Sequence, residues 1–177
     1  MIKRVKELRP DVDIATPDFR DFIEKFESEI NRGISTLCVL SIISEYGEKG
    51  TYGYEIMKEL EDRTDEILII EEGTLYPLLR KLERDSIVRS EKQKTGRKRK
   101  FYFLTENGKK ILNYITGYYS KLTKAISNIT DVDIQFKEGQ IFCPMCANKI
   151  EIGEDTPRFC TVCGFNIQKE LEERRLK

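Results

Sequence analysis

Residues 72–88 read EGTLYPLLRKLERDSIV, and this stretch decides the fold. Its apolar residues recur at i, i+3, i+4 and i+7, which is the spacing of one apolar stripe on an α-helix. These residues are Leu75, Leu78, Leu79 and Leu82. The opposite face is polar and cationic, with Thr74, Tyr76, Pro77, Arg80, Lys81 and Arg84. The pattern fits either an ordinary surface helix with a solvated basic face or a helix that contacts a polyanion.

The segments around this helix predict the rest of a small domain. Pro77 is expected in the first turn of the helix, where its missing N–H costs little. Upstream, Thr16 and Pro17 predict a helix start. The other expected elements are a helix ending near residues 31–33, a buried helix over 34–46, a helix capped by Thr51, a short strand or extended connector over 65–71, and strands at 87–91 and 100–104. This order is typical of a winged helix-turn-helix domain, a mainly α fold with a small β component (α+β).

Positive charge is concentrated on the helix and on the hairpin that follows it. The whole chain has 31 basic and 31 acidic residues, so its net charge is zero. Residues 73–110 hold 12 basic and 4 acidic residues, which is a net charge of +8. A local excess of this kind is expected of a surface that binds nucleic acid.

The composition excludes several classes of protein. The chain has no histidine, so Ser/His/Asp catalysis, Cys/His catalysis and His-ligated metal sites are absent, and we expect no enzyme. No apolar run reaches the roughly 20 residues that span a bilayer. The first residues, MIKRVKELRPDVD, contain no apolar core of a signal peptide. We therefore expect a cytoplasmic protein without a membrane partner.

Three segments resemble a known family. They are GYEIMKEL at 53–60, EGTLYPLLRKLERDSIV at 72–88 and GRKRKFYFLTENGKKIL at 96–112, and they are similar to the PadR-type winged-helix transcriptional regulators. The resemblance covers roughly residues 34–129. Its most specific part is Gly-Thr-Leu-Tyr-Pro at 73–77, which a generic winged helix does not need.

The resemblance implies a regulator that binds DNA as a homodimer formed by its last helix. It also implies that small aromatic or cationic compounds can act as effectors near the dimer interface, although no ligand can be inferred for this chain. The chain departs from the family at one point. Asp85-Ser86-Ile87 follows the reading helix where the family usually has Gly-Leu-Ile, and we expect this difference to alter a turn without changing the fold.

The helix expected after Thr105, its N-cap, carries a second apolar pattern. The spacing alternates between four and three residues for nearly three heptads, as in a coiled-coil seam. The seam consists of Ile111, Ile115, Tyr118, Leu122, Ala125 and Ile129. It can pack on the same subunit's N-terminal helix or on a second copy, and we expect both contacts in a homodimer through helix 106–130 and the N-terminal helix. A two-fold dimer presents two reading helices about 34 Å apart, which matches a palindromic site.

Four of the five cysteines form two C-x-x-C pairs near the end of the chain, Cys143 with Cys146 and Cys160 with Cys163. Two such pairs suit one tetrahedral Zn²⁺, and the segment resembles a zinc ribbon, with two short strands expected between the pairs. Iron in a rubredoxin-like site and a redox dithiol are the alternatives. We expect one structural zinc ion, because a module of about 40 residues cannot bury enough surface to fold alone.

Two functional hypotheses follow. The first is a dimeric, sequence-specific DNA-binding regulator, whose expected DNA contacts are Thr51, Tyr52, Tyr54, Thr74, Tyr76, Arg80, Lys81, Arg97, Lys98, Arg99 and Lys100. The second is a winged-helix and zinc-ribbon factor that acts by protein contacts with the transcription machinery, like archaeal general factor E. Residues 128–177 hold nine acidic and seven basic residues, a net charge of −2, so the ribbon is expected to contact a protein or to be purely structural.

The expected division of the chain has five parts. These are an N-terminal segment and amphipathic helix at 1–32, a winged helix-turn-helix domain at 33–105, a dimerisation helix at 106–130, a zinc ribbon at 136–166 and a charged tail at 167–177.

Overall fold

The computed structural model describes residues 16–92, 99–130, 139–143, 145, 146, 148–153, 155–168 and 171. It divides into two compact units, Met1–Lys109 and Lys110–Lys177. Residues 1–15 and the predicted hairpin tip, with Arg97 and Lys98, lie outside the described residues. None of the described helices is both long and apolar enough to cross a membrane.

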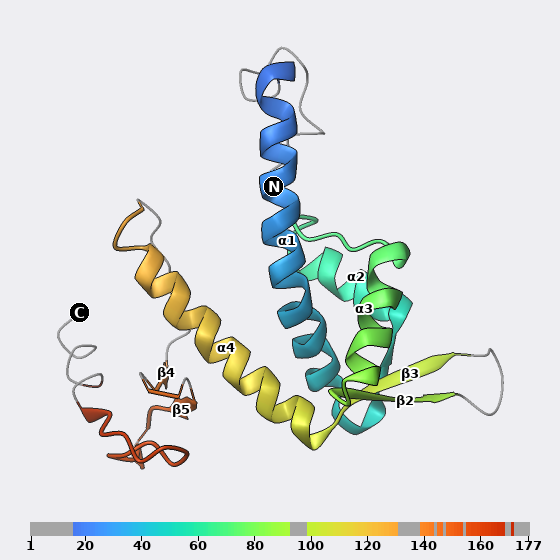
Figure 1. The fold of residues 1–177 in the computed structure, drawn as a ribbon. Helices are drawn as coiled ribbons and strands as arrows, with labels where there is room; N and C mark the ends of the chain where they lie inside the picture. The colour runs from blue at the N-terminus through green and yellow to red at the C-terminus, as the bar shows by residue number, and fades with distance from the viewer. Residues whose placement is uncertain are drawn as a thin grey trace. The chain divides into compact units, whose positions relative to one another are not determined.

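Helix α1 runs without interruption from Pro17 to Tyr46 (Figure 1). It begins as predicted, with Thr16 at the N-cap and Pro17 in the first turn. The predicted end near residues 31–33 is wrong, and the boundary drawn between 32 and 33 lies inside this helix. A side chain at Gly33 would meet nothing within 4 Å, so the glycine lies on an open face. Its cost to the helix, about 1 kcal/mol, is too small to end a helix whose next turns pack in the core.

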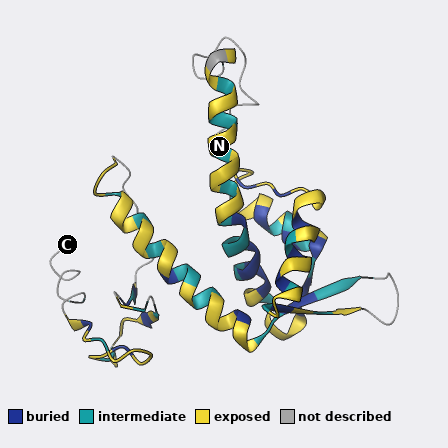
Figure 2. Ribbon diagram, in the orientation of Figure 1, coloured by how far each residue is buried: buried dark blue, intermediate teal, exposed yellow. Residues whose placement is uncertain are grey.

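The two halves of α1 differ in burial (Figure 2). The C-terminal half supplies the centre of the core, where Val39, Leu40 and Ile43 are fully buried. The N-terminal half is largely exposed, including its apolar residues Phe19, Phe22, Phe26 and Ile30.

A three-stranded antiparallel sheet forms the other side of this unit. Its strands are β1 (Thr51–Tyr52), β2 (Val88–Lys92) and β3 (Lys100–Leu104), in the order β1-β3-β2. Strands β2 and β3 form the predicted hairpin, whereas β1 was not predicted from the sequence. Thr51 pairs with Tyr102 in the sheet and is fully buried. The prediction that Thr51 caps the following helix is wrong, because the helix begins at Gly53 and its N-cap is Tyr52.

After α1 come the short 3₁₀ helix η3 (Gly47–Lys49), strand β1 and then helix α2 (Gly53–Arg63). A connector then leads to α3. Its residues alternate in burial, with Leu68 and Ile70 buried and Ile67 and Ile69 exposed. No strand forms there, so the strand alternative is wrong. The segment is a connector that begins with a turn, in which Asp65 and Glu66 have positive φ.

Helix α3 runs from Glu72 to Arg84, and its leucine stripe packs inward as predicted. Leu75, Leu79 and Leu82 are buried. The prediction that Pro77 lies in the first turn is wrong, because the helix begins five residues before it. The proline ring removes the hydrogen bond to the carbonyl of residue i−4, which is Gly73. Gly73 is exposed and has open space around it, so water can satisfy its carbonyl and the helix continues.

The end of α3 is the turn at which the chain departs from the family pattern. The N–H of Ile87 donates to the Leu82 carbonyl at 2.9 Å and that of Ser86 to the Glu83 carbonyl at 3.0 Å. These two bonds form a Schellman motif, whose C′ residue takes a left-handed conformation and is usually glycine. Here Ser86 adopts a φ of 57°. The turn therefore requires a left-handed residue, and here the serine takes this strained conformation.

Ser86→Gly is expected to raise the free energy of unfolding by about 0.5–1 kcal/mol, because glycine removes the steric penalty of the left-handed conformation. Chemical denaturation of the purified chain measures the change. Ser86→Ala is the matched control and should bring no gain, since alanine has the same steric penalty. An equal gain from both variants would show that the backbone strain is not the cause.

The second unit contains most of helix α4 (Glu106–Ile126) and the four-cysteine module. Thr105 caps α4 as predicted, since its hydroxyl accepts the N–H of Gly108 at 2.9 Å. The helix ends before Ile129, which is 85% exposed.

The four-cysteine module holds strands β4 (Gln140–Phe142) and β5 (Lys149–Glu151), which pair antiparallel around the first cysteine pair. The prediction of two strands between the cysteine pairs is wrong. Of the residues described between the pairs, only those of β5 form a strand, while Phe159 and Asn166 form an isolated bridge around the second pair. Ile167 was assigned to the charged tail, yet it is fully buried in the module's core with Ile141 and Ile150.

Candidate functional site

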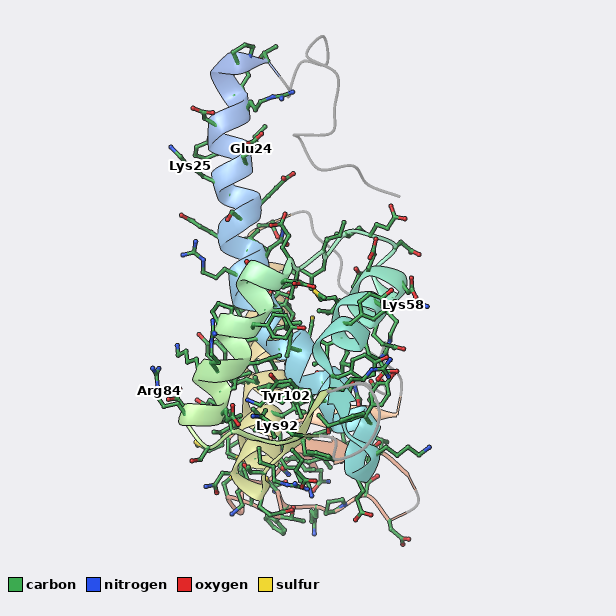
Figure 3. The ribbon with its side chains drawn as sticks, turned by 90° about the vertical axis from the view of Figure 1, so that its right-hand side faces the viewer. Glu24, Lys25, Lys58, Arg84, Lys92 and Tyr102 are labelled. Carbon is green, nitrogen blue, oxygen red and sulfur yellow. The ribbon has the colours of Figure 1, made fainter. Side chains whose placement is uncertain are left out.

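The polar face of α3 is open to solvent. Thr74, Pro77, Arg80, Lys81 and Arg84 are exposed, and Tyr76 is 37% exposed. In Figure 3, Arg84 projects from the end of α3, while Lys58 of α2 projects on the other side of the view. The structure therefore presents the cations of α3 on one uncovered face.

The two most family-specific motifs touch each other. A Cβ on Gly53, the first residue of α2, would lie 2.7 Å from the ring of Tyr76 on α3. A side chain at this position would displace the Tyr76 ring, and glycine leaves room for it. Tyr76 thus packs on the start of α2, where Tyr54, the residue after Gly53, is 64% exposed. This contact brings the expected DNA contacts of α2 and α3 together.

Tyr52 joins the base of the hairpin to the same region. The guanidinium carbon of Arg99 lies 4.4 Å from the Tyr52 ring centroid, which is a cation–π contact. The Tyr52 ring also packs edge to face on Phe101, with centroids 5.7 Å apart. Of the four predicted wing cations, Arg99 is therefore held next to the start of α2.

Lys100 has a different environment. Its Nζ lies 2.8 Å from a carboxylate oxygen of Glu83 on α3, and Glu83 also accepts a hydrogen bond from the Ser90 hydroxyl. The hydrogen bonds from Lys100 and Ser90 lower the pKa of Glu83 below its usual value. Lys100 thus connects the hairpin to α3, and part of its charge is neutralised within the protein. Sequence spacing did not reveal this tie, because its three residues are far apart in the chain.

The four clustered cysteines converge on one point. The sulfur atoms of Cys143 and Cys163 are 3.5 Å apart, those of Cys146 and Cys160 are 3.6 Å apart, and all four lie within 4.8 Å of one another. Four sulfurs about 2.3 Å from one zinc ion stand about 3.8 Å apart in a regular tetrahedron. The spacing is far longer than the roughly 2.05 Å of a disulfide. The four thiols therefore fit one metal ion.

The two cysteine turns are each closed by the same kind of backbone hydrogen bond, from the first cysteine to the residue five positions later. The N–H of Cys143 donates to the carbonyl of Asn148, and the N–H of Cys160 donates to that of Phe165, at 2.9 and 2.8 Å. Gly164 has a φ of 72° and allows the second turn. Each turn thus offers two sulfurs to the same side, which is the arrangement of a zinc knuckle.

The thiols differ in how readily they ionise. Burial raises the pKa of Cys143, and that of Cys146 to about 12. At Cys160 burial also opposes ionisation, but backbone N–H groups of Cys163 and Val162 and the neighbouring thiols outweigh it and lower the pKa to about 6. A bound metal ion would favour the thiolate form of Cys143 and Cys146, whose burial opposes ionisation.

The seam of α4 is uncovered in the single chain. Ile111, Tyr118 and Leu122 are 38%, 56% and 41% exposed. A sustained apolar stripe of this kind is normally packed on another surface. Asn113, on the polar side of α4, hydrogen bonds to the four-cysteine module, a contact for which the sequence carried no signal.

Comparisons with known proteins agree with this geometry. Residues 39–114 match the Transcriptional regulator PadR-like family. An uncharacterized protein of Lysinibacillus sphaericus is 33% identical over 114 residues, which are 63% of this chain and 95% of that protein. The match to the family ends before the four-cysteine module.

Two solved structures are similar to this chain. A transcriptional regulator from Clostridium thermocellum is 28% identical with a TM-score of 0.54, over 58% of this chain and 98% of that one. A PadR family transcriptional regulator from Eggerthella lenta has the same identity and TM-score, over 64% of this chain and 93% of that one. The winged-helix fold, the contact between the two family motifs and these matches identify the chain as a member of the PadR-like family of transcriptional regulators, and not an enzyme.

Proposed function

We propose that this protein is a sequence-specific DNA-binding regulator that binds a palindromic operator as a homodimer. The observation that carries the proposal is the uncovered cationic face of α3, next to the start of α2 and the base of the hairpin. Thr74, Arg80 and Lys81 lie on that face. Arginine and lysine contact phosphates and guanine edges, and threonine can contact either phosphates or bases.

We assign supporting roles to the elements beside α3. Tyr54 is an exposed phenol at the start of α2 and can reach a phosphate. Tyr52 keeps Arg99 next to that helix start, while Tyr76 is anchored on Gly53 with part of its ring exposed. Arg97 and Lys98 are the expected wing contacts, and buried Thr51 positions the start of α2 through the sheet.

We propose that the dimer forms through two exposed apolar stripes. One is the seam of α4, within the predicted segment 106–130, and the other lies on the N-terminal half of α1. The second stripe is formed by Phe19, Phe22, Phe26 and Ile30, which are between 44% and 73% exposed. Exposed apolar stripes of this length normally mark protein–protein contacts. A two-fold dimer would place two copies of α3 about 34 Å apart, which is one turn of DNA.

We propose that the four-cysteine module binds one structural Zn²⁺ per chain. Zinc takes four thiolates in a tetrahedron and needs no further ligand, which agrees with a donor set of four sulfurs. Iron in the same site is the alternative. We propose that the winged helix-turn-helix domain ends at residue 105, that residues 106–130 form the dimerisation helix and that the ribbon begins at 136. We also propose a cytoplasmic location, where such a regulator meets DNA.

The test is equilibrium binding of the purified full-length chain to duplex DNA, with metal analysis of the same preparation. We expect duplex binding without any other protein and one zinc ion per chain. A chain that binds duplex only together with RNA polymerase would instead be a factor that acts by protein contacts with the transcription machinery. One iron atom per chain would correct the metal without affecting the DNA-binding proposal.

A further inference from the structure

Asn113 of α4 hydrogen bonds to the four-cysteine module through both the nitrogen and the oxygen of its side-chain amide. Its Nδ2 donates to Oδ1 of Asn148 at 2.9 Å, and its Oδ1 accepts the backbone N–H of Lys149 at 3.3 Å. Asn113 and Asn148 are both half-buried. A single side chain of the helix thus holds the point where β5 begins.

The residues that Asn113 holds also close the first cysteine turn. The Asn148 carbonyl accepts the N–H of Cys143 at 2.9 Å, and Lys149 pairs with Phe142 in the β4–β5 ladder. A metal ion bound by Cys143 and Cys146 would fix this turn, because small metal-binding modules fold with their ion. We therefore expect metal binding to fix the position of Asn148, and with it the hydrogen bond between Asn148 and Asn113 of α4.

Asn113 lies on the face of α4 opposite the apolar seam. Asn113 and Leu122 are nine residues apart, which is about 180° around a helix that turns about 100° per residue. Gly117, one turn after Asn113 on the same face, is buried, while Leu122 is 41% exposed. The module can therefore contact the face of α4 opposite the seam and leave the seam free for a second subunit.

The sequence of α4 indicates that the helix needs its contact with the four-cysteine module for stability. The face around Asn113 continues with Thr116, Gly117 and Ser120, which are poor helix formers. Glycine in a helix interior is unfavourable because it loses the most backbone freedom. A helix of this composition depends on packing for its stability. Loss of the module's structure would leave the weak middle of α4 without its hydrogen-bonded partner.

We propose that metal occupancy of the four-cysteine site controls the order of α4, and through α4 the stability of the dimer and its affinity for DNA. The ligand class is a thiophilic divalent metal ion, and Asn113 is the residue that transmits its presence. The regulatory part rests on the dimeric DNA-binding function proposed above. Because coupling is reciprocal, DNA should raise the affinity for the metal by the factor by which the metal raises the affinity for DNA.

The experiment compares zinc-loaded and chelator-treated full-length chain by three measurements. These are hydrogen exchange of the α4 amides, the dimer dissociation constant by sedimentation, and the affinity for duplex DNA. We expect metal removal to raise α4 exchange and the dimer dissociation constant about 10-fold or more. Asn113→Ala should keep one zinc ion per chain, yet its α4 exchange should approach that of the metal-free protein. Asn128→Ala, an exposed asparagine just beyond α4, is the matched control and should behave as wild type.

A second variant separates the two hydrogen bonds. Asn113→Asp keeps the acceptor for Lys149, loses the donor to Asn148, and should give intermediate exchange. The coupling is wrong if α4 exchange in the wild type does not depend on the metal, or if Asn113→Ala matches Asn128→Ala. Equal DNA affinity with and without metal would overturn the regulatory part. If neither form binds duplex, the proposed function fails, while exchange and sedimentation still decide the coupling.

Discussion

Gly108→Ala is expected to lower the free energy of unfolding by about 3 kcal/mol or more. A Cβ at this position, in the first turn of α4, would overlap the carbonyl oxygen of Ile87. That carbonyl accepts the backbone N–H of Thr105 at 3.1 Å and its hydroxyl at 3.2 Å. Moving the carbonyl away would break its hydrogen bond with the Thr105 N–H, directly before the first turn of α4. Chemical denaturation, followed by circular dichroism, measures the loss.

Gly33→Ala is the matched control for this prediction. Gly33 lies inside α1 and a Cβ there would meet nothing within 4 Å. Alanine should therefore stabilise the protein by about 0.5–1 kcal/mol, since it lowers the backbone entropy cost of the helix. If Gly108→Ala is as stable as wild type, the close approach of α4 to the end of α3 is not present in solution.

The second large effect is expected on DNA affinity. Replacing Arg80 and Lys81 together by alanine should weaken duplex binding about 100-fold, because each lost contact to a phosphate or a base edge costs about 1–3 kcal/mol. If both cations contact phosphates, the slope of log affinity against log salt should fall by about 1.8. Fluorescence anisotropy over a series of salt concentrations measures both quantities.

The control removes the same charge from another place. Lys25 of α1 and Lys58 of α2 are exposed, and neither lies on the cationic face of α3 (Figure 3). Their double alanine variant tests the effect of net charge alone, and we expect a change in affinity of less than about threefold. Equal losses in the two double variants would mean that net charge, and not the face of α3, governs binding.

The local patterns of the sequence predicted much of this fold because they report burial directly. The leucines of α3 and the cap at Thr105 lie as expected, and the four cysteines meet as their spacing required. Contacts between segments that are distant in the sequence could not be predicted from these local patterns. Nothing local indicated that Gly53 makes room for Tyr76, or that Glu83 holds Lys100.

The errors have a common physical cause, which is that tertiary packing outweighs local signals. Gly33 was taken as the end of a helix, but the buried residues that follow it keep α1 continuous. Pro77 was taken as a helix start, but an exposed glycine four residues earlier tolerates it inside α3. Thr51 was taken as a cap because its side chain suits one, but α2 begins one residue later and Tyr52 stands at its N-cap. In each case the local preference is about 1–3 kcal/mol, which the core can offset.

The central claim is that two copies of α3 read one palindromic site. Its most direct test is selection of bound duplexes from a random pool by the zinc-loaded full-length chain, followed by the mass of the selected complex. We predict an inverted repeat whose half-site centres lie about 10 base pairs apart, or a multiple of that spacing, with two chains per duplex. A selected set without an inverted repeat, or one chain per duplex, would contradict the claim.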